Sequence, residues 1–390
     1  MRVLVACDKF KGSLTATEVA DHIRRGLLRA HPGLEVRTTL VADGGDGMLA
    51  AAEQAGFTRV PVTVTGPTGP TGPRVDTAYA VRRRPDAVGT GRCEVVVELA
   101  DACGLLRLPD GIRAPLTASS RGLGEVIAEA LRKERPTALY AGIGGSASTD
   151  GGSGMLAALG IIARDAAGEP VPDGGAGLAA VAEVDARRFL PRLALTHLEF
   201  ACDVDSPLTG PSGAAHVFAP QKGATPEQVA QLDAALTHWA DVVTARAGHD
   251  VRATPGAGAA GGVGYAALAL LGARLRPGVE IVLDLVGFDA ALTGCDLVIT
   301  GEGSLDAQTL LGKTPAGVAR RAQAHGIPVV AVCGRAALTR EEIAASGFAA
   351  VYALTDLEPD PQTCMAQAGP LLERLVAERV SRALAPGSPG

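Results

Sequence analysis

Apolar runs alternate with amphipathic stretches at the beginning of this chain. Arg2–Ala6 is an almost continuous apolar run, as expected for a parallel strand that is covered on both faces. A helical pattern over Thr15–Ala30 follows, then a strand over Glu35–Val41, a glycine-rich turn and a helix over Met48–Ala55. Two successive strand–loop–helix units predict the opening of a doubly wound parallel sheet.

From about residue 60 the pattern changes. The segments VPVTVTG and RVDTAYAVR alternate apolar and polar residues, which predicts two short strands joined by a hairpin across PTGPTGP. The chain then mixes strands, helices and glycine loops up to about residue 286 without a regular alternation of strand and helix. A regular strand–helix alternation returns near the end, with strands predicted over Asp296–Thr300, Pro328–Cys333 and Ala350–Leu354, and helices over Pro315–His325, Thr339–Ser346 and Gln362–Leu384.

These patterns predict an α/β protein of two domains, consistent with a length of 390 residues. Residues 1–60 and 287–390 are expected to form one Rossmann-like domain with a doubly wound parallel sheet. Residues 61–286 are expected to form a second, mixed α/β domain inserted into the first. Ligands of such proteins bind at the carboxyl ends of the strands, and we expect the site in the crevice between the domains.

The overall charge and composition exclude several classes of function. The net charge is −6 and aromatic residues make up 3% of the chain, which disfavours nucleic acid as a partner. The seven cysteines show no CxxC spacing and indicate neither a zinc site nor a disulfide framework. The longest apolar stretch, from Gly256, is interrupted by glycines and predicts a buried helix rather than a membrane span. We expect a cytoplasmic protein with no membrane partner.

Lysine is rare in this chain: only five of the 36 Lys and Arg residues are lysines. Four of them, Lys9, Lys11, Lys222 and Lys313, lie in glycine-containing segments that precede predicted helices. Lysine is a compact point charge that can follow a moving phosphate, whereas arginine is a rigid planar fork. This placement indicates phosphate chemistry, although chance placement is the alternative.

The loops after the first two strands carry candidate binding groups. DKFKGS places Asp8, a candidate catalytic residue, with Lys9, Lys11 and Ser13 just before a helix N-terminus. The two ammonium groups and the free helix amides predict an anion site. A salt-bridged surface turn is the alternative. The loop ADGGDG then supplies Asp43 and Asp46, whose carboxylates suit Mg²⁺ or a substrate hydroxyl, or serve simply to form the turn.

A glycine-rich loop, GIGGSASTDGG, follows a predicted strand in the middle of the chain. Its backbone amides and hydroxyls can surround a phosphate or a carboxylate, and Asp150 is a candidate general base. It is not the GxGxxG dinucleotide fingerprint, so NAD is not indicated. A structural crossing loop is the alternative. The anion-binding candidates of this loop are Gly144, Gly145, Ser146, Ser148 and Thr149.

Two further loops supply acidic and basic residues. Asp203 follows the predicted strand LEFA and is a candidate general base, a metal ligand or a cap, and Lys222 lies downstream of it. TGEGSLDAQTLLGKTP offers Glu302, Asp306 and Lys313. Residues 307–314 match a relaxed Walker A pattern, but the preceding strand is predicted to end at Thr300, which argues against a P-loop.

Taken together and in this order, these motifs resemble the bacterial glycerate kinase type I family. The resemblance runs from Val3 to about Leu384 and rests on DKFKGSL, ADGGDG, GIGGSASTDGG, CDVDSPLTGPSGA, VFAPQKGA, GAGAAGGVG and VITGEGSLDAQTLLGKTPAGVA. It implies ATP-dependent phosphorylation of D-glycerate, usually at the 2-hydroxyl, with ADP as the other product. Phosphorylation at the 3-hydroxyl stays an alternative, and we also expect a homodimer.

Phosphoryl transfer depends mainly on charge neutralisation, metal binding and alignment. Lys11 and Lys222 are the expected clamps for phosphate or the substrate carboxylate, with Lys9 and Lys313 in support. Lys9 is a weaker candidate than Lys11, because many family members carry serine at the position of Lys9. Mg²⁺ or hydroxyl ligands are expected among Asp43, Asp46, Glu302 and Asp306. A kinase for another small hydroxy acid, or a non-catalytic sensor of glycerate or nucleotide, are the alternative functions.

Overall fold

The computed structural model describes residues 1–85, 91–306, 309 and 313–384. The chain divides into two compact units. Unit 1 comprises Met1–Asp43, Ala50–Ala55 and Val279–Gly390, and unit 2 comprises Gly44–Leu49 and Gly56–Gly278. Both units are α/β, as predicted, whereas the domain boundaries drawn from the sequence stay predictions.

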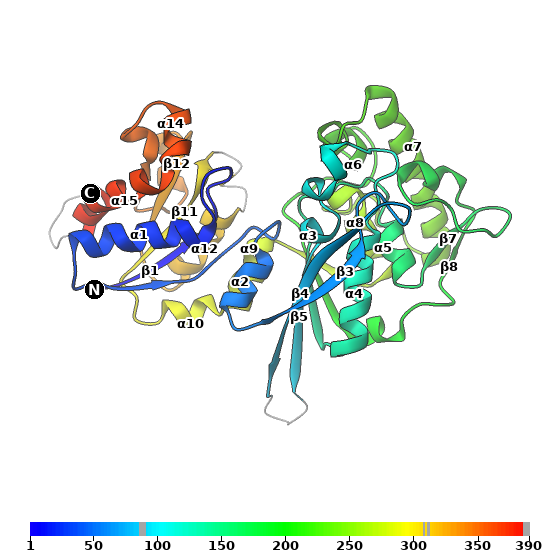
Figure 1. Ribbon diagram of the computed structural model, residues 1–390, viewed down its shortest axis with the longest axis horizontal. Helices are drawn as coiled ribbons and strands as arrows, with labels where there is room; N and C mark the ends of the chain where they lie inside the picture. Colours follow the sequence, from blue (N-terminus) through cyan, green and yellow to red (C-terminus); the bar gives the residue numbers. More distant parts are fainter. Residues whose placement is uncertain (86–90, 307–308, 310–312, 385–390) are drawn as a thin grey trace. The chain divides into compact units, whose positions relative to one another are not determined.

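Unit 1 is built on a five-stranded sheet with the order β13-β12-β11-β1-β2, in which each pairing is parallel (Figure 1). From β1 the chain adds β2 on one side, and it later adds β11, β12 and β13 on the other. The direction of winding therefore reverses between β1 and β11. The strands are β1 (Arg2–Cys7), β2 (Glu35–Thr38), β11 (Leu297–Leu305), β12 (Val329–Ala336) and β13 (Ala350–Ala353).

Helices cover this sheet on both faces. α1 (Ala16–Ala30) and α15 (Ala368–Glu378) pack together over one face, where the odd-numbered β1 residues Val3 and Val5 join their core. α12 (Thr314–Ala324) packs against β1, β11 and β12, and side chains alternate between faces along a strand. The remaining helices assigned mainly to this unit are α9 (Gly278–Val286), α10 (Phe288–Leu292), α13 (Arg340–Ala345) and α14 (Pro361–Ala366).

Unit 2 contains a mixed sheet with the order β10-β9-β6-β5-β4-β3. The predicted hairpin is confirmed, because β3 and β4 are antiparallel neighbours. β4 also pairs antiparallel with β5, whereas the pairings β5–β6, β6–β9 and β9–β10 are parallel. The strands are β3 (Thr58–Thr65), β4 (Arg74–Arg84), β5 (Arg92–Glu98), β6 (Ala138–Gly142), β9 (His197–Ala201) and β10 (Arg274–Arg276), with a separate pair β7 (Ile162–Arg164) and β8 (Glu183–Asp185).

The helices of unit 2 enclose a large apolar core that includes Trp239, Tyr265 and Phe200. The glycine-interrupted apolar stretch forms a buried helix, α8, as predicted. Among the described residues, no helix combines the length and the apolar composition that a membrane crossing requires. The helices are α3 (Leu99–Cys103), α4 (Arg121–Glu134), α5 (Ser153–Ala158), α6 (Ala214–Phe218), α7 (Pro226–Ala247) and α8 (Val263–Leu270), while α2 (Met48–Gln54) is divided between the two units.

Several predicted elements had the wrong extent. β2 ends at Thr38 rather than Val41, and β12 continues to Ala336 rather than ending at Cys333. β11 does not end at Thr300 but continues to Leu305, because its pairing with β12 persists through Ser304 and Leu305. The predicted gap between the end of the strand and residues 307–314, which was the reason to exclude a P-loop, is therefore wrong. Most of residues 307–314 lie outside the described part of the chain. The predicted helix Gln362–Leu384 is broken after α14, because Pro370 has no N–H to donate to the carbonyl of Ala366.

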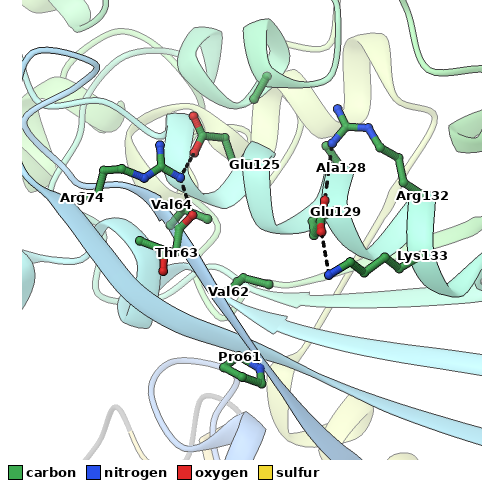
Figure 2. A pocket seen from close by; sticks show the side chains of 11 residues that line it. Pro61, Val62, Thr63, Val64, Arg74, Glu125, Ala128, Glu129, Arg132 and Lys133 are labelled. Atoms are coloured by element: carbon green, nitrogen blue, oxygen red, sulfur yellow. Dashed lines mark hydrogen bonds and ion pairs between the residues drawn. The ribbon is translucent and has the colours of Figure 1, made fainter.

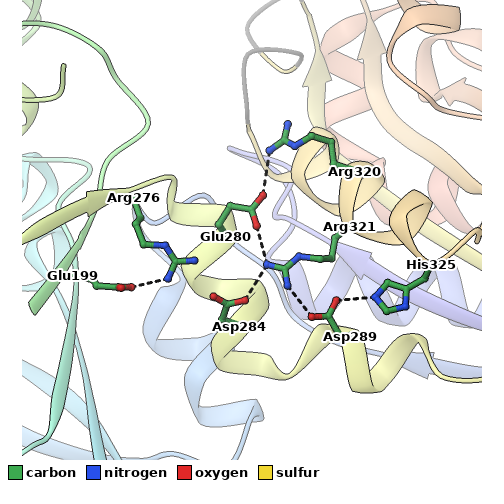
Figure 3. A network of polar contacts seen from close by, with 8 residues as sticks. All are labelled: Glu199, Arg276, Glu280, Asp284, Asp289, Arg320, Arg321 and His325. Atoms are coloured by element: carbon green, nitrogen blue, oxygen red, sulfur yellow. Dashed lines mark hydrogen bonds and ion pairs between the residues drawn. The ribbon is translucent and has the colours of Figure 1, made fainter. Parts of the chain in front are cut away.

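An ion-pair network holds α12 in unit 1 (Figure 3). The guanidinium of Arg321 contacts three carboxylates at 2.8–2.9 Å: those of Glu280 and Asp284 on α9, and that of Asp289 on α10. These three acidic groups raise the pKa of Arg321, with the hydrogen bond to Glu280 as the largest cause. Arg321 therefore links the outer end of α12 to two other helices.

We expect Arg321→Leu to lower the free energy of unfolding of unit 1 by about 1–3 kcal/mol, because three neighbouring carboxylates lose their shared cation. Urea unfolding, followed by circular dichroism, measures the change. Arg320→Leu is the matched control, since Arg320 is more exposed and its ion pair is with Glu280 alone among the described residues, at 3.3 Å. Its expected loss is about 0–1 kcal/mol. Equal losses in the two variants would contradict the role given to Arg321.

Candidate functional site

The reversal of winding in unit 1 creates a natural binding position at the carboxyl ends of β1 and β11. Cys7 of β1 pairs with Gly301 of β11, and the next backbone N–H, that of Asp8, donates to the Gly301 carbonyl at 2.9 Å. Asp8 and Glu302 thus lie at the same edge of the sheet although they are far apart in the sequence.

A cavity of about 500 Å³ opens at this edge, within unit 1. Its polar part gathers residues from the loop after β1, from β11 and from the start of α12, and its apolar part is formed by residues near α14 and α15. The sequence-predicted site residues that line it are Asp8, Lys9, Lys11, Ser13, Asp43, Glu302, Asp306 and Lys313. Its apolar residues include Phe10, Leu354, Pro361, Cys364, Met365 and Ala368.

Asp8 is the most buried charged group of this cavity, with 7% of its surface exposed. Its carboxylate accepts hydrogen bonds from the Lys9 backbone N–H at 2.7 Å and from the Thr314 hydroxyl at 3.0 Å. Burial, and next the charge of Asp43, raise the pKa of Asp8 to about 7. The carboxylate is thus held against the first turn of α12, in a position where a cation stabilises its charged form.

Glu302 belongs to the same acidic group. Burial raises its pKa, and the charges of Asp306 and Asp43 act in the same direction, while a hydrogen bond from the Thr309 hydroxyl and the charge of Lys313 oppose them. Asp43 and Asp306 are therefore close enough to act electrostatically on Glu302. Among the described residues, however, no group of three or more His, Cys, Asp or Glu side chains is arranged to hold a metal ion by itself.

Cations line the same cavity. Lys9, Lys11 and Lys313 were predicted, and the structure adds Arg335 from the end of β12. Lys313 occupies the N-cap position of α12. The cavity thus offers positive charges beside carboxylates, which is the combination that binding of a phosphate together with a metal ion needs.

Two serines of the cavity differ in what they contact. The hydroxyl of Ser13, a predicted phosphate ligand, donates to the carbonyl of Phe10 at 3.1 Å and so organises the turn after β1. The hydroxyl oxygen of Ser304 is buried and has no hydrogen-bond partner among the described residues. Buried hydroxyls are normally paired, and Ser304 lines the cavity, which makes it a candidate to bond a ligand there.

A second hollow, of about 590 Å³, lies in unit 2 over β3 and α4 (Figure 2). Its charged residues are paired with one another: Lys133 contacts Glu129 at 2.9 Å, and Arg74 approaches Glu125 at 3.9 Å. None of the sequence-predicted site residues lines it. The chemistry that the sequence indicates is therefore located elsewhere.

The glycine-rich loop of unit 2 follows β6 and is organised around Asp150. This residue is fully buried, and its carboxylate accepts hydrogen bonds from the backbone and hydroxyl of Ser120 and from the backbone N–H groups of Gly152 and Gly154. A carboxylate so enclosed fits the role of general base poorly, because its oxygens are already occupied and substrate has no access. Asp150 instead fixes the path of the loop.

Lys222 lies beneath the same loop, with 3% of its surface exposed, and its ammonium group donates to the Ser148 carbonyl. Burial lowers the pKa of Lys222 to about 8, against the opposing effects of Asp150 and Cys103. The predicted clamp is therefore a support for the loop in this conformation. The hydroxyl oxygen of Thr149 is buried without a partner among the described residues, whereas the Ser146 hydroxyl accepts from the Ser148 backbone N–H at 3.2 Å.

Glycines allow the loop that contains Asp46 to pack directly onto the glycine-rich loop. A Cβ atom on Gly142 would lie 2.7 Å from the Gly44 carbonyl oxygen, and one on Gly144 would lie 2.7 Å from the Gly45 Cα. Gly145 has φ of +72°, a conformation that favours glycine. The two loops therefore form one surface at the carboxyl ends of the unit 2 strands, on which Asp46 is exposed.

Glu98, at the end of β5, secures this arrangement and was not identified from the sequence. Its carboxylate accepts hydrogen bonds from the backbone N–H groups of Met48 and Leu49, the latter at 3.2 Å. Burial raises the pKa of Glu98 to about 7. A single glutamate that ends an apolar strand was the only signal in the sequence, and it could not indicate which backbone the carboxylate would hold.

Asp203 lies at the carboxyl end of β9 and is exposed. One of its carboxylate oxygens accepts a hydrogen bond from the Gly278 backbone N–H at 2.8 Å. Unlike Asp150, it is accessible to a substrate hydroxyl and keeps its place as a candidate general base. The sequence-predicted residues thus form two groups, one in the unit 1 cavity and one at the carboxyl edge of the unit 2 sheet.

Comparisons with known proteins agree with this chemistry. Residues 3–385 match the model of the glycerate kinase family. The chain is 41% identical to a glycerate kinase of Bacillus subtilis over 91% of its own length and 90% of the relative's, and 40% identical to a glycerate 2-kinase of Escherichia coli K12 over 86% and 85%. A crystal structure from Salmonella typhimurium LT2, provisionally named glycerate kinase 2, has a TM-score of 0.81 and 40% identity and covers 98% of each chain.

The buried Lys222 predicts a specific dependence of stability on pH. The unfolded chain keeps a proton on Lys222 up to a pKa of 10.5, whereas the folded protein releases it near 8. Between these values the unfolded state binds more protons, so the stability of the wild type relative to Lys222→Met should rise with pH, by on the order of 3 kcal/mol. Urea unfolding at a series of pH values measures this difference.

Lys133→Met controls for the loss of an exposed lysine. A difference between wild type and Lys222→Met that stays flat, or falls, across this pH range would contradict burial of the ammonium group.

Proposed function

The chain belongs to the glycerate kinase family, and from this premise we propose that it transfers the γ-phosphoryl group of ATP to D-glycerate. We further propose the 2-hydroxyl as acceptor, which gives 2-phosphoglycerate and ADP. The relative from Escherichia coli that bears the name glycerate 2-kinase supports this position. Membership of the family does not favour the two alternatives, a kinase for another hydroxy acid and a non-catalytic sensor.

The observation that supports this function most directly is the mixture of lysines and carboxylates at the switch point of unit 1. A phosphoryl group in transfer carries negative charge on its oxygens, and enzymes stabilise it mainly by placing cations around it. Lys11, Lys313 and Lys9 line the cavity of unit 1, and their proposed role is to bind phosphate oxygens there. The buried Asp8 holds the first turn of α12, next to Lys313, in place through Thr314.

Mg²⁺ fits the acidic part of this cavity. It prefers oxygen ligands and is commonly bound by one or two carboxylates together with substrate phosphates, so a complete protein cage is not required. Asp43, Glu302 and Asp306 would hold it, since burial and mutual repulsion raise the pKa of Glu302 and a cation would relieve both. When bound, Mg²⁺ supplies charge neutralisation for the phosphates. Asp46 belongs to unit 2, and its assignment as a ligand stays a prediction.

Unit 2 supplies groups suited to the acceptor substrate. The backbone amides of Gly144 and Gly145 and the hydroxyls of the same loop suit a carboxylate, while Asp150 and Lys222 keep the loop in shape. Asp203 is the proposed base that accepts the proton of the attacking hydroxyl, because it is exposed at a strand end. A cytoplasmic location and a homodimer stay predictions.

The position of phosphorylation can be tested with purified protein, ATP and D-glycerate, with enolase added to report the product. Enolase converts 2-phosphoglycerate, so we expect phosphoenolpyruvate to form at once, without phosphoglycerate mutase. Formation only after mutase is added would assign the 3-hydroxyl instead. If ADP is released with another hydroxy acid of a panel but not with glycerate, that hydroxy acid replaces glycerate as the proposed substrate.

The role of Lys11 can be tested by Lys11→Arg. We expect kcat/KM to fall far more than about tenfold, because the planar fork cannot place a compact charge at the same position. Lys133→Arg is the matched control, as Lys133 lies on the exposed face of α4 and contacts Glu129. It should retain the kinetics of the wild type. Near-wild-type kinetics for Lys11→Arg would refute the phosphate role of this lysine.

A further inference from the structure

The cavity of unit 1 is lined by two chemically different sets of side chains. One set is the lysines and carboxylates described above. The other set, called the apolar wall here, comes from the region of α14 and α15 and consists mainly of Leu354, Pro361, Cys364, Met365 and Ala368. Phosphate and metal binding explain the charged set only, so the apolar wall needs an additional explanation.

Met365 is the residue of the apolar wall whose exposure most clearly indicates a binding surface. It is 53% exposed, one of a small number of large apolar side chains so exposed in the described part of the chain. Its terminal methyl lies over the loop after β1, since a Cβ atom on Gly12 would be 3.1 Å from it. Methionine is flexible and polarisable, and it makes favourable contacts with aromatic rings. A flat aromatic group would fit against it.

The size of the cavity favours a large ligand. Its volume of about 500 Å³ lies within the usual range for cofactor and drug-sized ligands, about 300–1,000 Å³. Glycerate is far smaller and has no apolar surface to cover Met365 or Ala368. A nucleoside triphosphate, by contrast, has an aromatic base for the apolar wall and a phosphate chain for the charged side chains.

Building on the proposed kinase function, we propose that the unit 1 cavity is the nucleotide subsite. The purine lies on the apolar wall around Met365 and Ala368, and the triphosphate runs from it towards Lys11 and Lys313. Ser304, whose hydroxyl oxygen has no hydrogen-bond partner among the described residues, lines the same cavity. The acceptor substrate then binds outside this cavity.

Photolabelling of the full chain with 8-azido-ATP, whose reactive azide is on the purine, tests this directly. After trypsin digestion, the peptide Glu341–Arg374 contains the apolar wall and should carry label that excess ATP prevents. Absence of ATP-protected label from this peptide overturns the proposal, wherever else label is found. Labelling requires no turnover, so this result is independent of the proposed reaction.

Variants of Met365 give a second test with a kinetic readout. Met365→Glu places a carboxylate against the purine, and we expect both the Kd for a fluorescent ATP analogue and the KM for ATP to rise about tenfold or more. The KM for glycerate should change by less than about twofold. Met365→Leu keeps an apolar surface and should bind ATP nearly as the wild type does.

Leu106→Glu is the matched control, because Leu106 is 94% exposed and belongs to unit 2. It should alter neither constant. A rise in the KM for glycerate with unchanged nucleotide binding in Met365→Glu would overturn the proposal and assign the cavity to the acceptor. If the label lies in the expected peptide but glycerate is not phosphorylated, the nucleotide subsite is supported and the proposed function is refuted.

Discussion

The parallel pairing of β1 with β11 is the constraint on which the site in unit 1 depends. It joins the first strand of the chain to a strand almost 300 positions later, and its register places Asp8 immediately after the Cys7–Gly301 pair. Because β2 lies on the other side of β1, this pairing also creates the point where the direction of winding reverses. A ligand-binding cavity at this edge follows from the topology.

Close backbone approach is a second condition for this edge. A Cβ atom on Gly301 would lie 2.0 Å from the Val332 carbonyl oxygen, and one on Gly334 would lie 2.5 Å from the Gly303 carbonyl oxygen. These glycines let β11 and β12 continue side by side beyond the point where the apolar run ends. Glu302 and Ser304 are thereby carried into the cavity on a paired strand, which restricts them more than a free loop would.

Charged residues in glycine loops have two distinct uses in this protein. In unit 1, the cations and carboxylates line a cavity. In unit 2, Asp150 and Lys222 point into the protein and bind backbone groups, so they stabilise the shape of the glycine-rich loop. Burying these charges opposes folding unless they are paired, which explains why each makes hydrogen bonds to the backbone.

The sequence by itself determined the α/β class, the family and the identity of most strand-end residues, because hydrophobic periodicity and ordered motifs are local properties. It did not determine how far β11 extends, since that depends on pairing with β12. It also did not determine where the last helix breaks, since the helical pattern of apolar residues continues through Pro370. Tertiary structure alone decided that Asp150 and Lys222 are buried supports, that Glu98 holds a distant backbone, and that Met365 faces a cavity. Burial and partner choice depend on residues far away in the chain, and a linear pattern does not contain them.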